Sequence, residues 1–139
     1  MKIGIDLDGV ITHLGFINPS VKLPQWLYVL LAPIILLMHP CQKKELNNIE
    51  TNGHTIIVVS ARPRWFENLT KTWLKYHGIP FEKIHCVGFG KGTRQRKLKI
   101  IEQEKIEIFI ENDGKIREFL NHNSIKTISS LNQLNGLLT

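Results

Sequence analysis

The chain has 139 residues, of which 42% are hydrophobic and 22% charged, and its formal net charge is +6. This composition is typical of one globular domain with its own core and argues against a disordered or repetitive chain, while the positive charge favours anionic partners. Two cysteines, Cys41 and Cys86, are too few for a disulfide framework, so we interpret both as free thiols in a reducing compartment. The acidic residues in the opening MKIGIDLDG argue against a signal peptide, and we expect a cytoplasmic protein, with membrane association left open.

The first half of the chain contains two predicted strands and two predicted helices. Lys2–Leu7 is a short apolar run followed by a turn, and His54–Ser60 is a β-branched run of the kind that is buried on both faces of a parallel sheet. Residues 42–53 and 62–78 predict helices. Each of these segments ends in a glycine, which readily adopts the left-handed conformation that closes many helices.

The second half of the chain continues the alternation of strands and helices. In chain order the sequence predicts a strand at 82–90, a basic glycine-containing loop at 88–97 that we expect to be solvated, a helix at 97–104, a strand at 106–113, a helix at 114–123, a strand at 125–129 and a final helical turn or two. Strands that alternate with helices indicate a parallel sheet covered on both faces. We therefore predict a single α/β domain over residues 1–139, a three-layer Rossmann-like fold with about five strands.

Residues 12–40 interrupt this alternation and are interpreted as an insertion. The insertion contains an unbroken apolar run of thirteen residues, Trp26–Met38. A bilayer crossing needs roughly 20 apolar residues, so a membrane span is not expected. Three interpretations stay open: a small cap helix that packs on the body or on a second copy, a segment that lies in a membrane interface, and the lining of an apolar substrate pocket.

Polar side chains follow four of the predicted strands. In a parallel α/β sheet the ligand crevice lies outside the carboxyl ends of the strands, so we expect these groups to converge there. A cluster of carboxylates needs a cation to neutralise it, and an all-oxygen set suits Mg²⁺. The groups are Asp6 and Asp8, then Ser60 and Arg62, then a lysine among Lys91, Lys97 and Lys99, then Glu111 and Asp113.

Two carboxylates in this setting can perform phosphoryl transfer. Asp6 ends a rigid strand and suits the nucleophile that would form an aspartyl-phosphate, and Asp8 suits the general acid and base. The Ser60 hydroxyl could bind phosphoryl oxygens, although capping of the following helix is an equally good interpretation. A lysine would offset the charge on the phosphoryl group.

The segments DLDGV, VVSAR and IFIEND, with a lysine between the last two, resemble the four motifs of haloacid-dehalogenase-like phosphatases. Residues 70–85, TKTWLKYHGIPFEKIH, resemble the type-C 5′-nucleotidase-like branch of that family. The resemblance implies a Mg²⁺ cofactor, with Asp6 as nucleophile and metal ligand and Asp8 as acid/base and as a ligand through its backbone carbonyl. It also implies that Ser60, Ala61 and Arg62 bind phosphate.

For the motif lysine and for the acidic residue of the fourth motif, the resemblance leaves two candidates each. Lys97 lies fourteen residues before Glu111 and fits the family spacing best, and Lys91 is second. The fourth motif departs from the usual paired aspartates because the chain has Glu111, Asn112 and Asp113. We expect Asp113 to bind the metal in preference to Glu111.

The sequence therefore predicts a Mg²⁺-dependent phosphomonoester hydrolase whose substrate is a small nucleotide or sugar phosphate. The competing hypothesis is a weakly active or inactive binding protein of the same fold that recruits a partner or a membrane through its apolar insertion. We expect no sequence-specific nucleic-acid binding, and a homodimer or a peripheral membrane contact through Trp26–Met38 stays open.

Overall fold

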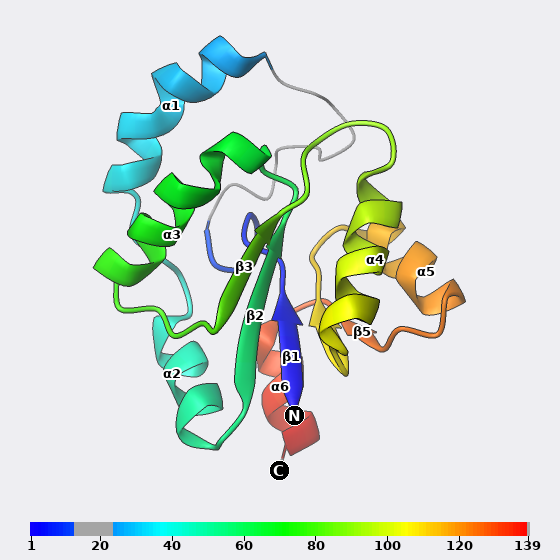
Figure 1. The fold of residues 1–139 in the computed structure, drawn as a ribbon. Coiled ribbons are helices and arrows are strands. Elements are labelled where there is room, and N and C mark those ends of the chain that lie inside the picture. Colours follow the sequence, from blue (N-terminus) through cyan, green and yellow to red (C-terminus); the bar gives the residue numbers. More distant parts are fainter. Residues whose placement is uncertain (13–23, 139) are drawn as a thin grey trace.

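Five parallel strands form the centre of the protein in the spatial order β3-β2-β1-β4-β5. The structure is a computed structural model that describes residues 1–12 and 24–138 (Figure 1). The strands are β1 (Lys2–Ile5), β2 (Thr55–Ser60), β3 (Lys83–Cys86), β4 (Ile108–Ile110) and β5 (Thr127–Ile128). The five-stranded parallel sheet that the alternating pattern predicted is confirmed.

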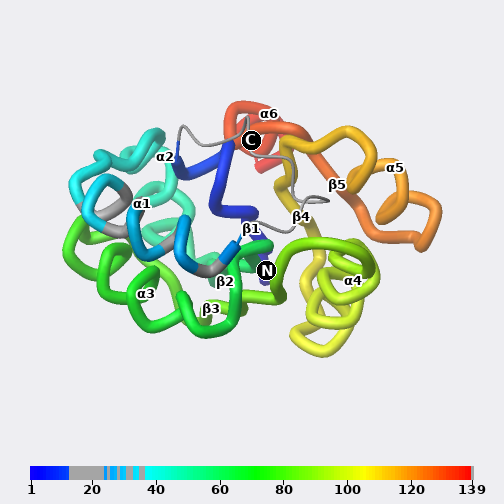
Figure 2. Tube along the Cα trace, turned by 90° about the horizontal axis from the view of Figure 1, so that it is seen from above, coloured from blue at the N-terminus to red at the C-terminus, as the bar shows by residue number. Residues whose placement is uncertain are grey.

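Helices cover both faces of this sheet. They are α1 (Gln25–Leu37), α2 (Lys43–Thr51), α3 (Glu67–Tyr76), α4 (Thr93–Glu104), α5 (Gly114–His122) and α6 (Leu131–Leu138), with a short 3₁₀ helix, η1, at Arg64–Phe66. Helices α2, α3 and α6 pack on one face and α4 and α5 on the other (Figure 2). The fold is thus the predicted three-layer, Rossmann-like α/β arrangement.

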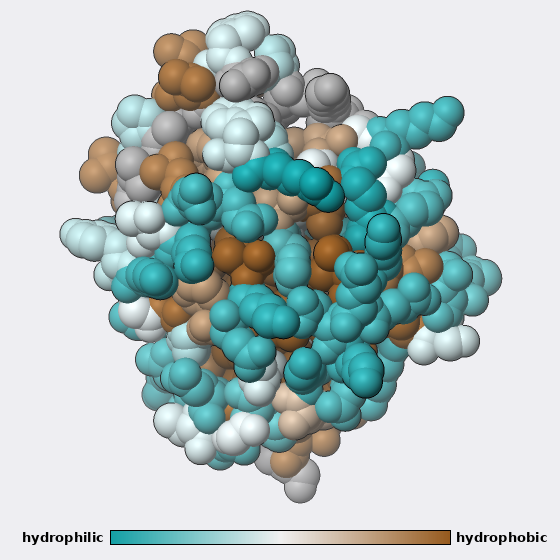
Figure 3. Space-filling model, viewed as in Figure 1, coloured by the Kyte–Doolittle hydropathy of each residue, from teal (hydrophilic) through white to brown (hydrophobic). Residues whose placement is uncertain are grey.

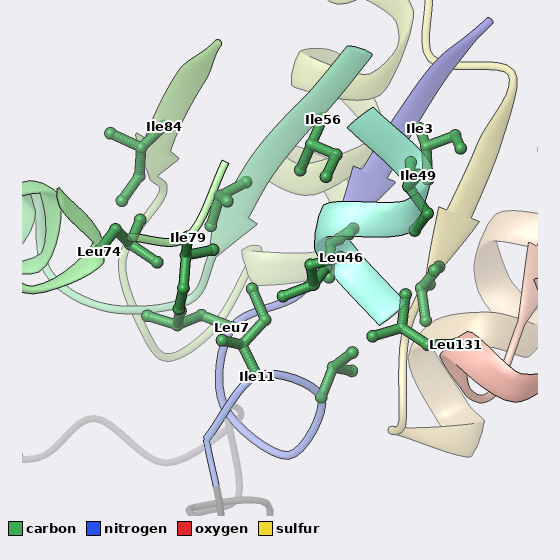
Figure 4. Packing of buried hydrophobic residues seen from close by; sticks show 14 of the residues in the cluster. Ile3, Leu7, Ile11, Leu46, Ile49, Ile56, Leu74, Ile79, Ile84 and Leu131 are labelled. Atoms are coloured by element: carbon green, nitrogen blue, oxygen red, sulfur yellow. The ribbon is translucent and has the colours of Figure 1, made fainter. Parts of the chain in front are cut away.

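The core consists of two apolar clusters, one on each side of the sheet. In the larger cluster Leu46 and Ile49 of α2 lie over Ile3 and Ile56 of the strands (Figure 4). The smaller cluster is built around Phe109 of β4 and receives residues from α4 and α5. Strands β2 and β4 contribute side chains to both clusters, so their apolar runs are buried on both faces of the sheet.

Both cysteines are free thiols, as the sequence indicated. Cys86 is buried on β3, and burial raises its pKa to about 12, so its sulfur is an inert core group. The Cys41 thiol donates to the backbone oxygen of Ile11 at 3.0 Å, which fixes the chain as it returns from the insertion to the sheet.

Several predicted boundaries were too long, for local reasons. β1 ends at Ile5 because the chain then turns tightly, with the amides of Ile11 and Thr12 both donating to the Leu7 carbonyl. β4 ends at Ile110, before residue 113, because the Asp113 carboxylate caps α5. The glycines at 53 and 78 have positive φ just after α2 and α3, as predicted.

The basic run before residue 97 is partly helical, whereas we expected a loop throughout, and its residues Lys91 and Arg94 are exposed as expected. Helix α4 begins at Thr93, four residues earlier than predicted. The Arg96 guanidinium turns back and donates to the carbonyls of Val87, Gly88, Phe89 and Lys91. One arginine therefore satisfies several backbone oxygens of the glycine-rich turn and fixes the start of α4.

The apolar insertion forms helix α1, with Pro33 inside it. The Trp73 indole nitrogen on α3 donates to the Met38 backbone oxygen at 3.1 Å, which attaches the end of the insertion to the body. Residues 13–23, which include His13, lie outside the described residues. Among the described residues, no helix is both long enough and apolar enough to cross a bilayer.

Gly4 in β1 allows close packing between the sheet and the smaller cluster. A Cβ at this position would overlap the Phe109 ring and would lie 2.9 Å from Ile106 Cδ1. We expect Gly4→Ala to lower the free energy of unfolding by about 1–3 kcal/mol, the usual effect of overpacking. Urea unfolding measures this change. Gly136→Ala on α6, where a Cβ meets no atom within 4 Å, is the control and should not destabilise. Equal effects of the two substitutions would contradict the prediction.

Candidate functional site

The candidate site lies where the direction of the chain crossovers changes. β1 has β2 on one side and β4 on the other. Helix α2, between β1 and β2, packs on one face of the sheet and α5, after β4, on the opposite face, so the carboxyl ends of β1 and β4 flank the crevice expected at this edge. Asp6 and Glu111 are the first residues after these two strands, and Ser60 ends β2. Asp6, Ser60 and Glu111 thus lie at the carboxyl ends of three neighbouring parallel strands.

Lys97 joins the carboxylates that follow β1 and β4. Its ammonium lies 2.9 Å from Asp6 Oδ1 and 2.5 Å from Glu111 Oε2. The lysine is only 1% exposed, and both of its partners are also buried. Buried charges of this kind are tolerated only when they are paired. Lys97 comes from the second turn of α4, so the contact fixes α4 against the two central strands.

The electrostatics of this triad are unbalanced. Burial and the repulsion from Glu111 raise the pKa of Asp6 to about 8, and Lys97 only partly opposes this effect. Burial alone would lower the pKa of Lys97, but the attraction to Asp6 and Glu111 and the hydrogen bonds to both raise it. Lys97 therefore stays charged, while one more cation near Asp6 would help to keep that carboxylate ionised.

Asp8 lies in a separate ion pair with Arg62. The guanidinium donates from Nε to Asp8 Oδ2 at 2.9 Å and from Nη2 to Oδ1 at 2.7 Å, and the Thr12 hydroxyl also donates to Oδ1. Arg62 is 2% exposed and donates a further hydrogen bond to Thr70 Oγ1 on α3. Since a two-point contact fixes the orientation of a carboxylate, Arg62 fixes the Asp8 side chain.

The turn after β2 brings Ser60 to the same region. Its hydroxyl oxygen accepts the backbone N–H of Arg62 at 3.1 Å, and Ser60 and Ala61 are both buried. The serine thus shapes the turn that carries Arg62, and its own hydroxyl proton can be donated to another oxygen. Of the three residues expected to bind phosphate, Arg62 contacts the predicted acid/base residue.

The structure distinguishes the alternative residues that the sequence left open, Asp113 from Glu111 and Lys91 from Lys97. The Asp113 carboxylate accepts the backbone N–H groups of Lys115 and Ile116 and caps α5, whereas Glu111 faces Lys97. Lys91 is exposed at the turn before α4, whereas Lys97 is buried beside Asp6. The structure therefore brings Lys97 and Glu111 to Asp6, and it uses Asp113 to begin a helix.

Asn112 was not expected in the site. One terminal atom of its side-chain amide lies 3.2 Å from both the Asp8 backbone oxygen and Glu111 Oε1. With the nitrogen in that position Asn112 donates to both groups, and with its oxygen there three oxygens converge. Within residues 1–12 and 24–138, no three His, Cys, Asp or Glu side chains are grouped as a metal site. Amide and backbone oxygens could join one or two carboxylates and water around a metal bound here.

The raised pKa of Asp6 predicts a pH-dependent stability in the absence of metal. Its ordinary pKa is 3.8 and its pKa in the folded protein is about 8, so between these values the folded state binds more protons than the unfolded state. Stability that Asp6 contributes at low pH is therefore lost as pH rises towards 8. We expect the unfolding free energy of the wild type to fall relative to Asp6→Asn by at least about 1.4 kcal/mol, the equivalent of one pKa unit.

Urea unfolding in the presence of a chelator, at several pH values across this window, measures the difference. Glu107→Gln is the control because Glu107 is an exposed acid before β4, and its pH profile should follow that of the wild type. Parallel profiles for the wild type and Asp6→Asn would contradict the prediction.

Comparisons with known proteins show a similar fold over most of the chain and a similar sequence over part of it. No protein-family model matches the chain. A segment of 58 residues is 33% identical to a protein of Halalkalibacterium halodurans named "Putative nucleotidase", and the match covers 42% of this chain and 27% of that protein. Two solved structures of the Pnkp1/Rnl/Hen1 complex, one of them described as an RNA repair complex, are similar over 91% of the chain with a TM-score of 0.68.

The identity to those two structures is 14% and 13%, and the chain spans 41% and 45% of the chains that it matches. The likeness therefore concerns the fold. The chain has the three-layer α/β architecture that these structures contain, and its site is defined by its own residues.

Proposed function

We propose that the chain is a Mg²⁺-dependent phosphomonoester hydrolase of the haloacid-dehalogenase-like type. The observation that carries the proposal is the buried contact of Lys97 with Asp6 and Glu111 at the carboxyl ends of β1 and β4. A strand-end carboxylate beside a fixed cation suits attack on a phosphoryl group, because the cation stabilises the charge that develops on the phosphoryl oxygens. The nucleotidase name of the partly matching relative supports the same class of reaction.

Asp6 is the proposed nucleophile. Lys97 contacts its Oδ1, so Oδ2 is the oxygen that would attack phosphorus. A new bond between Asp6 and phosphorus forms as the ester bond to the leaving alcohol breaks, which gives an aspartyl-phosphate. Water then attacks this phosphorus, releases inorganic phosphate and regenerates the Asp6 carboxylate.

Asp8 is the proposed proton carrier. It would donate a proton to the leaving alcohol and then accept one from the attacking water, so that it returns to its starting state. Both of its oxygens contact Arg62 in this structure. The acid role therefore requires one Asp8 oxygen to leave Arg62 and turn towards the substrate, and Arg62 acts as the positioning residue for Asp8.

The remaining groups would bind the phosphoryl oxygens. Lys97 supplies a charge that its two carboxylate partners hold in place, and Ser60 supplies a hydroxyl donor. The substrate class that we propose is a small nucleotide or sugar phosphate, in line with the sequence resemblance and the relative's name.

The residues present fit a Mg²⁺ ion through oxygen donors. Within residues 1–12 and 24–138, the three carboxylates Asp6, Asp8 and Glu111 pair with two cations, Lys97 and Arg62. The Asp6 carboxylate and the Asp8 backbone oxygen would hold the ion, and the Asn112 amide, whose nitrogen donates to the Asp8 backbone oxygen without metal, would turn its oxygen to the same position to complete the all-oxygen set that Mg²⁺ prefers. When bound, Mg²⁺ neutralises phosphoryl charge and keeps Asp6 ionised. Glu111 would support the site through Lys97, and Asp113 would stay at the start of α5.

A panel of phosphomonoesters that includes nucleotides and sugar phosphates tests the reaction, with phosphate release measured with and without Mg²⁺. We expect turnover that requires Mg²⁺, and we expect Asp6→Asn to lower kcat at least about a thousandfold, as loss of a nucleophile does. Lys97→Met should also lose activity, whereas Lys91→Met, which changes an exposed lysine, should keep it. Turnover that survives Asp6→Asn would refute the proposed mechanism, and no turnover by the folded wild type would favour the binding-protein hypothesis.

Metal binding can be tested without any substrate. Mg²⁺ should raise the melting temperature of the wild type, because a ligand that binds only the folded state stabilises it. We expect Asn112→Leu to raise the Mg²⁺ concentration needed for half of this shift at least about tenfold. Asp113→Asn is the matched control because asparagine can still cap α5. An equal effect of Mg²⁺ on all three proteins would contradict the assignment of Asn112.

A further inference from the structure

Helix α1 presents a continuous row of apolar side chains to solvent. The row follows the 3–4 residue spacing of one helix face, and its members are 58–81% exposed. The residues are Trp26, Val29, Leu30, Ile34 and Leu37, and Pro33 in the same row is also exposed. The helix contains no charged residue. Figure 3 shows brown and pale residues gathered over α1 at the upper left of the molecule. An exposed face of this kind marks a binding surface.

Exposed lysines and an exposed tyrosine lie on α2 and α3. Lys43 and Lys44 begin α2, a few residues after α1, and both are exposed. Helix α3 lies beside α1 in Figures 1 and 2 and is attached to it by the bond from Trp73 to Met38. On α3 the lysines 71 and 75 are exposed, and Tyr76 is 81% exposed. Glu45 follows the two lysines of α2, and the Glu67 carboxylate of α3 accepts the backbone N–H of Cys86.

A second copy of the chain is a poor partner for this surface. A two-fold contact centred on α1 would bring the exposed lysines of α2 and α3 from both copies towards one interface, and like charges in an interface are unfavourable.

An anionic lipid bilayer can contact both the apolar row of α1 and the exposed lysines. The apolar row can enter the boundary between headgroups and acyl chains, while the neighbouring lysines contact lipid phosphates. Tryptophan and tyrosine are the residues that favour this boundary, and Trp26 and Tyr76 stand at the two ends of the patch in sequence. At 13 residues α1 is shorter than the roughly 20 that a crossing requires.

We propose that α1, with Lys43, Lys44, Lys71 and Lys75, is a peripheral binding surface for anionic membranes, in which α1 lies parallel to the bilayer plane. Figure 1 shows α1 towards the end of the molecule at which the carboxyl ends of the strands lie, and α2 towards the opposite end. The membrane contact does not depend on the proposed phosphatase activity, because none of its residues belongs to the site.

Sedimentation of the full chain with vesicles tests this proposal. The vesicles are made of phosphatidylcholine alone or of equal parts phosphatidylcholine and phosphatidylglycerol. We expect binding to the anionic vesicles that weakens as salt is added, because salt screens lipid charge, and weak binding to the neutral ones. Ile34→Glu should lower the affinity at least about tenfold, and Lys71→Glu with Lys75→Glu about fivefold each.

Leu137→Glu is the matched control because Leu137 is an apolar residue of α6 that is 50% exposed. It should bind vesicles like the wild type, and Lys126→Glu should do the same for charge. Circular dichroism checks that each variant is folded, and the wild type's sedimentation equilibrium checks for a dimer. Absence of the wild type from the anionic pellet would overturn the proposal. Equal losses for Ile34→Glu and Leu137→Glu, or a dimer that Ile34→Glu dissociates without vesicle binding by the wild type, would also overturn it.

Discussion

The buried ammonium of Lys97 is the interaction on which the rest of the site depends. It is the cation that contacts both Asp6 and Glu111, the first residues after two adjacent strands. Without it, two carboxylates would face each other in the interior at the edge of the sheet, which is strongly unfavourable. With it, α4 is tied to β1 and β4, and the turn before α4 is fixed in turn by Arg96. Lys97 therefore determines how α4 meets the sheet, and its neighbour Arg96 determines how the glycine-rich turn meets α4.

Arg62 is a second buried cation, and it pairs with Asp8 as Lys97 pairs with Asp6. Arg62 is placed by the turn after β2 and holds Asp8 through two hydrogen bonds, while Thr70 and the Ser60 hydroxyl hold Arg62 in place. The chain thus pairs each aspartate of its first motif with a different cation from a different element. This division explains how two acidic residues that are one residue apart can be tolerated, because their charges are compensated separately.

The site and the apolar helix are built on different principles. The site consists of buried polar groups that are paired by specific hydrogen bonds. Helix α1 instead exposes a row of apolar side chains to solvent. Buried polar groups require exact partners, so they define a geometry. An exposed apolar row requires only a nonpolar environment, so it can serve a surface as variable as a bilayer. The proposal of a membrane contact therefore leaves the chemistry of the site unchanged.

The sequence by itself determined the alternation of strands and helices, the parallel sheet and the placement of Asp6, Asp8, Ser60 and Glu111 at one edge. These features depend on local hydrophobic periodicity and on the rule that parallel strands end at the same edge. The tertiary structure alone decided which charges meet. Spacing favoured Lys97 over Lys91, but only the packing of α4 shows the contact with Asp6. Glu111 faces that lysine while Asp113 caps α5, and Arg62 binds Asp8, because side-chain partners depend on where distant elements cross. The sequence does not contain that information in any local pattern.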